Sequence, residues 1–205
     1  SEDLMKASAA LAAKHDVRLH THLAETHDET DFCIQMFGLR PVDYLEENGW
    51  LNERTWLAHG IHFDEGEIAR LGRHGVGVCH CPTSNMVLAS GQCRTLELEK
   101  AGVPVGLGVD GSASNDGSNM IQEVRQALLI GRLRYQADDL SHLDALYWAT
   151  KGSAQVLHRD DIGELAVGKQ ADLAFFKLDE LRFSGSHDPL AALVLCAAHQ
   201  ASDVM

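Results

Sequence analysis

The chain has 205 residues, of which 45% are hydrophobic and 23% charged, which suits one globular domain with a sizeable core. Thirty Asp and Glu against seventeen Lys and Arg give a formal net charge of -13, and the basic residues form no run, so a nucleic-acid partner is not expected. No apolar stretch reaches about eighteen residues and the first residues form an acidic amphipathic pattern, so we expect no membrane partner either.

Helical and strand periodicities alternate along the first part of the chain. Helices are predicted over 2–15, 28–38, 41–48, 65–74, 93–101 and 119–134, and a capping box at 141–144 opens another. Strands are predicted over 17–23, 55–60, 76–80 and 103–110. This alternation is typical of repeated right-handed βα units around a parallel sheet, so the predicted fold class is α/β.

The sequence changes character after about residue 160. The segment "DIGELAVGKQADLAFFKL" is strand-like and interrupted by glycine, as in a small antiparallel β unit. We therefore predict two parts without a linker between them, a βα region over 1–160 and a partial β-sandwich with the C-terminal segment over 161–205.

The chain contains an odd number of cysteines, five, and no two of them form a C-x-x-C pair. They are Cys33, Cys79, Cys81, Cys93 and Cys196. This usage argues against a disulfide framework and favours a reducing cytosol, so the predicted location is cytoplasmic. Cys79 and Cys81 flank a histidine, but one intervening residue is too few for a zinc-finger loop. We interpret all five as thiols of the core or of the surroundings of a site.

Polar side chains stand at the ends of the four predicted strands. His20 and His22 end the first strand, and the next three end at His59, His80 and Asp110. In parallel βα sheets and barrels, the loops at the carboxyl ends of the strands build the active site. The coincidence therefore predicts a functional site at that edge of the sheet.

These residue types suit metal-assisted hydrolysis. His20 and His22 lie two apart and share one face of their strand, and Glu25 follows where the chain can fold back over the same opening. A neutral imidazole binds zinc or a similar ion, and a nearby carboxylate that is not a ligand can move protons between water and substrate. Asp110 can add an oxygen ligand and accept the proton of an attacking water.

Each of these residues also has a structural interpretation. A lone histidine at a strand end is often a hydrogen-bonded filler, and an Asp before Gly is often a turn former. Glu25 could serve as the N-terminal charge of the next helix. Four such accidents at four successive strand ends are less plausible than one site, which favours the functional interpretation.

Four motifs, in chain order, carry a family resemblance: "HTHLAET", "WLAHGIHFDEGEI", "GVCHCPTSNMVLASG" and "GLGVDGSASND". They resemble the amidohydrolase superfamily, in the branch of guanine deaminase, chlorohydrolases and related aminohydrolases, and the similarity covers nearly the whole chain. The resemblance implies a distorted TIM (β/α)8 barrel with a small β-sandwich. The chain corresponds to barrel strands five to eight and part of that β-sandwich.

The resemblance implies roles for four residues. His22 matches the metal ligand at the end of the fifth barrel strand, and Glu25 matches the proton-shuttling acid of an H-x-x-E motif. His59 matches a histidine that orients water or polarises the substrate rather than binding metal tightly, and Asp110 matches a ligand that is also the general base. The implied cofactor is one divalent metal ion, zinc before iron.

The departure from the family pattern is large. The family's H-x-H metal pair on the first barrel strand, and the three βα units after it, have no counterpart in this chain, so we expect those ligands upstream of Ser1. Three further residues, His80, Asn85 and Ser112, are candidates for substrate contact or for support of the loops. A small zinc nucleoside deaminase is disfavoured, because "HLAE" and "HCPTSN" lack its H-x-E and P-C-x-x-C spacings.

The implied activity of the full-length enzyme is metal-dependent hydrolytic deamination of an aromatic heterocycle. The segments "VRLHTHLAET" and "HDPLAALVLCA" most resemble branch members that convert 8-oxoguanine to urate and ammonia. The alternatives are a guanine, pterin or triazine aminohydrolase or chlorohydrolase, or an inactive fragment without the H-x-H half of the site. The implied partner is a small heterocyclic substrate, and the resemblance also allows a homo-oligomer.

Overall fold

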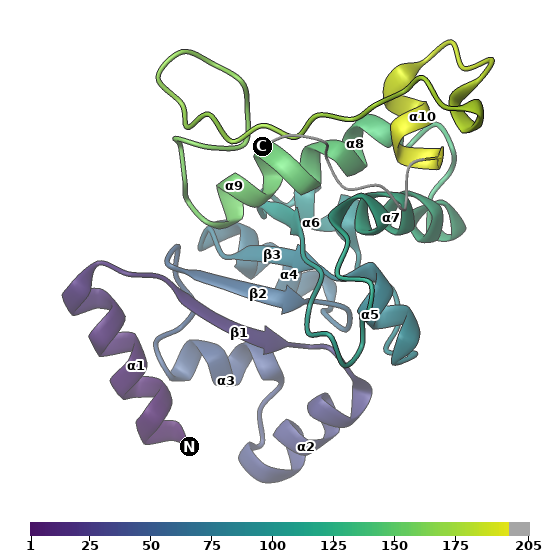
Figure 1. Cartoon of the computed structure of the whole chain (residues 1–205). Helices are drawn as coiled ribbons and strands as arrows, with labels where there is room; N and C mark the ends of the chain where they lie inside the picture. The colour runs from purple at the N-terminus through teal and green to yellow at the C-terminus, as the bar shows by residue number, and fades with distance from the viewer. Residues whose placement is uncertain (197–205) are drawn as a thin grey trace.

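The computed structural model describes residues 1–196, and a parallel sheet forms its centre (Figure 1). The four strands lie side by side in chain order: β1 (Leu19–Leu23), β2 (Thr55–His59), β3 (Gly77–His80) and β4 (Val105–Leu107). Leu23 is in register with His59, and His80 with Leu107, so the carboxyl ends of the strands lie along one edge. The predicted α/β fold class with a parallel sheet is confirmed.

Helices connect the strands and follow them: α1 (Glu2–His15), α2 (His27–Phe37), α3 (Pro41–Glu47), α4 (Glu65–Arg73), α5 (Pro82–Val87), α6 (Thr95–Lys100), α7 (Met120–Arg134), α8 (His142–Tyr147), the π-helix η1 (Trp148–Gly152), α9 (Ser153–Val156), the 3-10 helix η2 (Leu181–Phe183) and α10 (Pro189–Cys196). Ser141 caps α8 through a capping box, as the sequence predicts, and Asp64 caps α4 in the same way. Helices α1 to α3 lie beside β1, and α7 to α9 lie toward β4 (Figure 1).

Side chains alternate along β1, so that one face of the strand packs against the helices and the other face is exposed. Leu19 and Leu23 are buried in the core, whereas His20 and His22 are exposed on the other face. The core continues through Leu57 and Val78, which are fully buried on the central strands. Burial of the apolar face against the helices therefore fixes the histidines on the open face.

The fourth strand is shorter than predicted. It ends at Leu107, whereas the sequence predicts a strand to Asp110. Gly108 still donates its amide to the His80 carbonyl, at 3.0 Å, and a Cβ at this position would lie 2.9 Å from the Cys79 sulfur. Beyond this close approach the chain leaves the sheet, which places Asp110 in the loop after the strand.

The segment after α9 runs as turns and extended backbone. No strand forms between 157 and 196, because an isolated extended segment has no neighbour with which to pair its backbone groups. The division into 1–160 and 161–205 stays a prediction, and 197–205 lie outside the described residues. Across the described residues, no helix is both long and apolar enough to cross a membrane.

The sheet is open at both edges. In the described chain β1 and β4 each have one neighbouring strand, and four strands compare with the eight of a closed (β/α)8 barrel. The exposed face of β1, with its two histidines, therefore lines a half-open surface rather than a closed barrel interior.

Candidate active site

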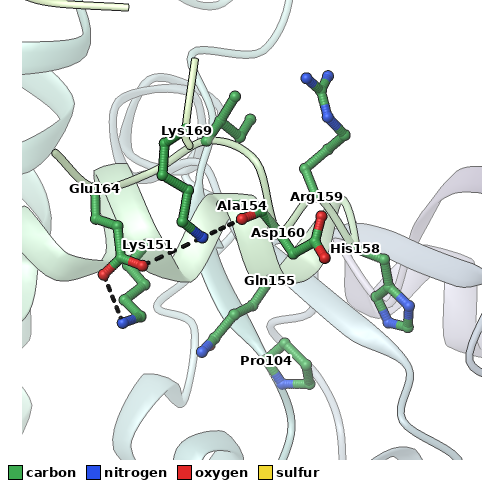
Figure 2. A pocket seen from close by; sticks show the side chains of 10 residues that line it. Pro104, Lys151, Ala154, Gln155, His158, Arg159, Asp160, Glu164 and Lys169 are labelled. Carbon is green, nitrogen blue, oxygen red and sulfur yellow. Dashed lines mark hydrogen bonds and ion pairs between the residues drawn. The ribbon is translucent and has the colours of Figure 1, made fainter. Parts of the chain in front are cut away.

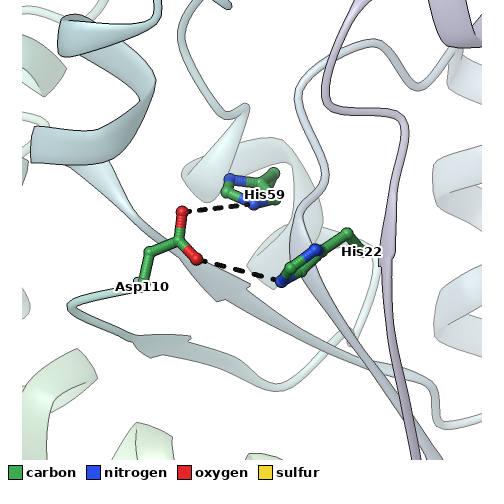
Figure 3. A group of neighbouring side chains, drawn as sticks. All are labelled: His22, His59 and Asp110. Atoms are coloured by element: carbon green, nitrogen blue, oxygen red, sulfur yellow. Dashed lines mark ion pairs between the residues drawn. The ribbon is translucent and has the colours of Figure 1, made fainter. Parts of the chain in front are cut away.

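Three of the predicted site residues meet at the carboxyl edge of the sheet (Figure 3). His22 Nε2 lies 3.9 Å from Asp110 Oδ1, and His59 Nε2 lies 3.7 Å from Asp110 Oδ2. Glu25 joins them, because its Oε2 lies 3.6 Å from His59 Nε2. These separations exceed ordinary hydrogen bonds, so the side chains converge on a shared space without closing it.

The backbone turns sharply where the strands deliver these side chains. Ala24, His59 and Asp110 have φ angles of 54°, 73° and 61°, the left-handed region that non-glycine residues rarely occupy. Such conformations cost about 1–3 kcal/mol each and persist where surrounding contacts hold them. Here the turns aim Glu25, His59 and Asp110 at one point.

Glu25 is positioned by a second acid, Glu29. The backbone amides of Ala24 and Glu25 donate to the two Glu29 carboxylate oxygens at 3.0 and 2.8 Å. Thr26 caps helix α2 by accepting from the Glu29 amide at 3.2 Å. This role of Glu29 is not among the predictions from the sequence, although Thr26 and Glu29 have the T-x-x-E spacing that is typical of a capping box at the start of a helix.

Asp110 is oriented by hydroxyl donors. Ser84 Oγ donates to its Oδ2 at 2.6 Å, and Ser114 Oγ does so at 3.3 Å, which leaves Oδ1 facing His22. Burial alone would raise the pKa of Asp110, but the bonds from Ser84 and the Gly111 amide, with the neighbouring histidines, hold its pKa below the ordinary value. The carboxylate is therefore kept charged.

His80 and Asn85 lie behind the site and are buried. Asn85 Oδ1 lies 2.8 Å from His59 Nδ1, and Asn85 Nδ2 lies 3.5 Å from His80 Nδ1. Burial, with a smaller contribution from His59, lowers the pKa of His80 to about 3, so this ring is neutral. Ser112 is exposed on the loop after Asp110. Substrate contact by these three residues stays a prediction.

Glu123, a fully buried acid on α7, joins helix α5 to the loop after Asp110. Its Oε2 accepts from the Thr83 amide at 3.1 Å, and its Oε1 accepts from Asn115 Nδ2 at 2.8 Å. Burial raises the pKa of Glu123, against the opposing effect of these hydrogen bonds. No sequence pattern predicts this role, because the contact with Thr83 joins residues forty positions apart.

His20 belongs to the edge of the site. Its ring stacks on Trp56 with centroids 3.6 Å apart, and its Nδ1 lies 3.2 Å from the Trp56 carbonyl oxygen. Burial against that ring lowers the pKa of His20. The edge of its ring also meets the ring of His22, with centroids 5.7 Å apart, so His20 borders the site without joining the group of His22, His59 and Asp110.

The donor set fits a divalent metal ion. Among the described residues, His22, His59 and Asp110 form the one group of three whose candidate ligand atoms lie within 4.8 Å of one another. Imidazole nitrogen and carboxylate oxygen are the ligands that zinc takes in catalytic sites. His22 and Asp110 have partly open surroundings, which leaves room for a further ligand and for substrate.

A separate cavity of about 590 Å³ lies at the amino end of the sheet (Figure 2). Pro104, directly before β4, lines it, as do Lys151 and Lys169. Both lysines pair with Glu164, at 2.9 and 3.3 Å. This cavity opens at the end of the strands opposite to the site residues and contains none of them.

Comparison with known proteins defines the class to which this site belongs. The sequence model of the amidohydrolase family matches residues 1–199, and the chain belongs to that family. It is 70% identical over 203 residues to an 8-oxoguanine deaminase of Pseudomonas aeruginosa, a match that covers 99% of this chain and 45% of the relative. The chain thus spans about half the length of such relatives.

Solved structures of the same superfamily match the fold. An adenosine deaminase from Xanthomonas campestris with bound zinc superposes with a TM-score of 0.93 at 35% identity, over 98% of this chain and 46% of that one. The zinc complex of an atrazine chlorohydrolase from Arthrobacter aurescens gives 0.91 at 36% identity, over 95% and 44%. The predicted family and the kinship with barrel-forming deaminases and chlorohydrolases are confirmed.

Proposed function

We propose that the full-length protein is a zinc-dependent deaminase that hydrolyses 8-oxoguanine to urate and ammonia. The observation that carries this proposal is the convergence of His22, His59 and Asp110 on one space, with Glu25 beside it. The 70% identity to an 8-oxoguanine deaminase supports the choice of substrate. Zinc is supported by the zinc-bound structures that share the fold.

The site residues would have different roles in a hydrolytic deamination. His22 and Asp110 would hold the ion. When bound, zinc supplies the positive charge that makes water a nucleophile near neutral pH. Asp110, kept ionised by Ser84, accepts a proton from the attacking water.

The proton then has to reach the purine. Glu25 protonates the ring nitrogen next to C2 while the water oxygen bonds to C2, and His59 orients that water from the other side. Glu25, which has given its proton to the ring nitrogen, then takes the proton of the new hydroxyl on C2 and delivers it to the exocyclic nitrogen, so that the bond between C2 and this nitrogen breaks and ammonia leaves. The product carries oxygen at C2, which is urate.

A second substrate is the main alternative. The same metal and proton-transfer residues would serve guanine, a pterin or a chlorinated or aminated triazine, because substrate choice rests on pocket residues outside this constellation. The structural likeness to an atrazine chlorohydrolase favours keeping triazines among the candidates.

We place the reaction in the cytoplasm, since the described cysteines are all free thiols.

The test is a substrate panel with full-length, zinc-loaded protein. Ammonia release is measured with 8-oxoguanine, guanine, isoxanthopterin and an aminated triazine, and chloride release with a chlorinated triazine; chelator-treated protein gives the background. We expect the highest kcat/KM with 8-oxoguanine and the ultraviolet spectrum of urate as product. A higher value with another heterocycle would replace the substrate, and no turnover of any of them would refute the proposed function.

A further inference from the structure

The ring of His59 makes different contacts on its two sides. Its Nε2 faces the open space, where carboxylate oxygens of Glu25 and Asp110 lie 3.6 and 3.7 Å away. Its Nδ1 faces the protein interior, where Asn85 Oδ1 lies 2.8 Å away. The side chain of His59 is almost fully buried, so no bulk water competes for Nδ1. The partner of Nδ1 therefore governs which ring nitrogen carries the proton.

The contacts of Asn85 determine which atom it offers to His59. Its amide nitrogen lies 3.5 Å from Nδ1 of His80, a ring that burial keeps neutral. With the amide donating toward His80, the carbonyl oxygen of Asn85 turns toward His59. A carbonyl oxygen only accepts hydrogen bonds, so Nδ1 of His59 must carry a hydrogen. The opposite tautomer would set two lone pairs against each other at 2.8 Å.

Asn85 has little freedom to change this arrangement. It is fully buried on α5, and the same short helix places Ser84 against Asp110. The first turn of α5 is tied to α7, because the Thr83 amide donates to the buried carboxylate of Glu123. The amide oxygen is therefore fixed in position before any ligand arrives.

We propose that Asn85 is a positioning residue for the reaction: its amide oxygen holds a proton on Nδ1 of His59, so that the tautomer with Nε2 free can accept from the reacting water. In the opposite tautomer, Nε2–H would donate to Glu25 or Asp110 and could not accept from water. This inference rests on the proposed role of His59, but the tautomer itself can be measured without substrate.

The experiment compares three variants with the parent chain. Asn85→Leu removes the acceptor and fills the space, and Asn85→Asp keeps an acceptor oxygen. Asn48→Leu is the matched control, since Asn48 is also a buried asparagine but bonds to the Tyr44 carbonyl, on α3. Long-range ¹H–¹⁵N spectra of metal-free protein with ¹⁵N-labelled histidine, at about pH 8.5, report which nitrogen of each neutral ring is protonated.

We expect His59 to carry its proton on Nδ1 in the parent chain, in Asn85→Asp and in Asn48→Leu, and on Nε2 in Asn85→Leu. A parent chain with the proton on Nε2 would overturn the inference, even if Asn85→Leu does not fold. An Nδ1 proton that persists in folded Asn85→Leu would overturn it as well. Absence of deaminase activity, by contrast, would remove the proposed function and leave this result standing.

The full-length, zinc-loaded enzyme provides a second readout. Asn85→Leu is expected to lower kcat about 10²-fold with little change in KM, and Asn85→Asp to recover part of that loss. Equal kcat values for the two variants would contradict a role for the acceptor oxygen.

Discussion

Removing the hydroxyl of Ser84 is expected to destabilise the folded chain and to weaken the charged form of Asp110. Ser84 Oγ is buried and donates to Asp110 Oδ2 at 2.6 Å, and the Asp110 side chain is only 15% exposed. A hydrogen bond to a charged acceptor contributes about 1.5–3 kcal/mol. The Ser84→Ala substitution should therefore lower the free energy of unfolding at pH 7 by about that amount.

The pH dependence follows from the lowered pKa of Asp110. A carboxyl whose folded pKa lies below its unfolded value stabilises the fold above about pH 4, and that stabilisation is lost as the pH falls through the folded pKa. The hydrogen bond from Ser84 is the largest of the effects that lower this pKa. In Ser84→Ala the pKa of Asp110 therefore rises, and part of the stabilisation is absent.

Two measurements on metal-free protein check this prediction. Urea unfolding at pH 7 gives the change in stability, and ¹³C NMR titration of the Asp110 carboxyl gives the direction of the pKa change. Ser153→Ala is the control, because Ser153 Oγ donates to a neutral carbonyl, that of Trp148, at 2.7 Å. A folded Ser84→Ala chain in which Asp110 titrates as in the parent would refute the reasoning.

Two further predictions concern stability. Because the pKa of buried His80 is about 3, the unfolded chain binds a proton below about pH 6.5 that the folded chain does not bind, and the free energy of unfolding therefore falls as the pH falls. Between pH 7 and pH 5 this loss is about 2 kcal/mol, and it should be absent in His80→Gln, as measured by urea unfolding at the two pH values. In α4, a Cβ on Gly72 would lie 1.9 Å from the Ala101 carbonyl oxygen, whereas one on Gly66 meets nothing closer than 3.3 Å. Gly72→Ala should therefore lower the free energy of unfolding by about 1–3 kcal/mol, more than Gly66→Ala does, and equal melting temperatures for the two variants would contradict this difference.

The sequence was sufficient to predict the parallel sheet and the edge at which the site forms. Alternation in "VRLHTHL" separates buried Leu19 and Leu23 from exposed His20 and His22, a local pattern that survives into the structure. The caps at Asp64 and Ser141 are also local, since each side chain bonds to an amide three residues on. Such features need no knowledge of the rest of the fold.

The supporting contacts of the site were not predictable in the same way. Ser84 reaches Asp110, and Asn85 reaches His59, across twenty-six positions of the chain, and Glu123 reaches Thr83 across forty. No local period encodes such pairs, because they depend on how α5 and α7 pack. The segment near residue 170 is predicted to form strands and forms none, because β-propensity alone does not provide a neighbouring strand with which to pair.

The central claim is that Glu25 transfers protons in a site where other residues hold the metal. It is tested most directly with Glu25→Gln in the full-length protein, by measuring bound zinc and the kcat for ammonia release from 8-oxoguanine on the same samples. We predict unchanged zinc content and a kcat lower by about 10²–10⁴-fold. A variant that retains zinc and deaminates 8-oxoguanine at a rate within about tenfold of the parent would contradict the account.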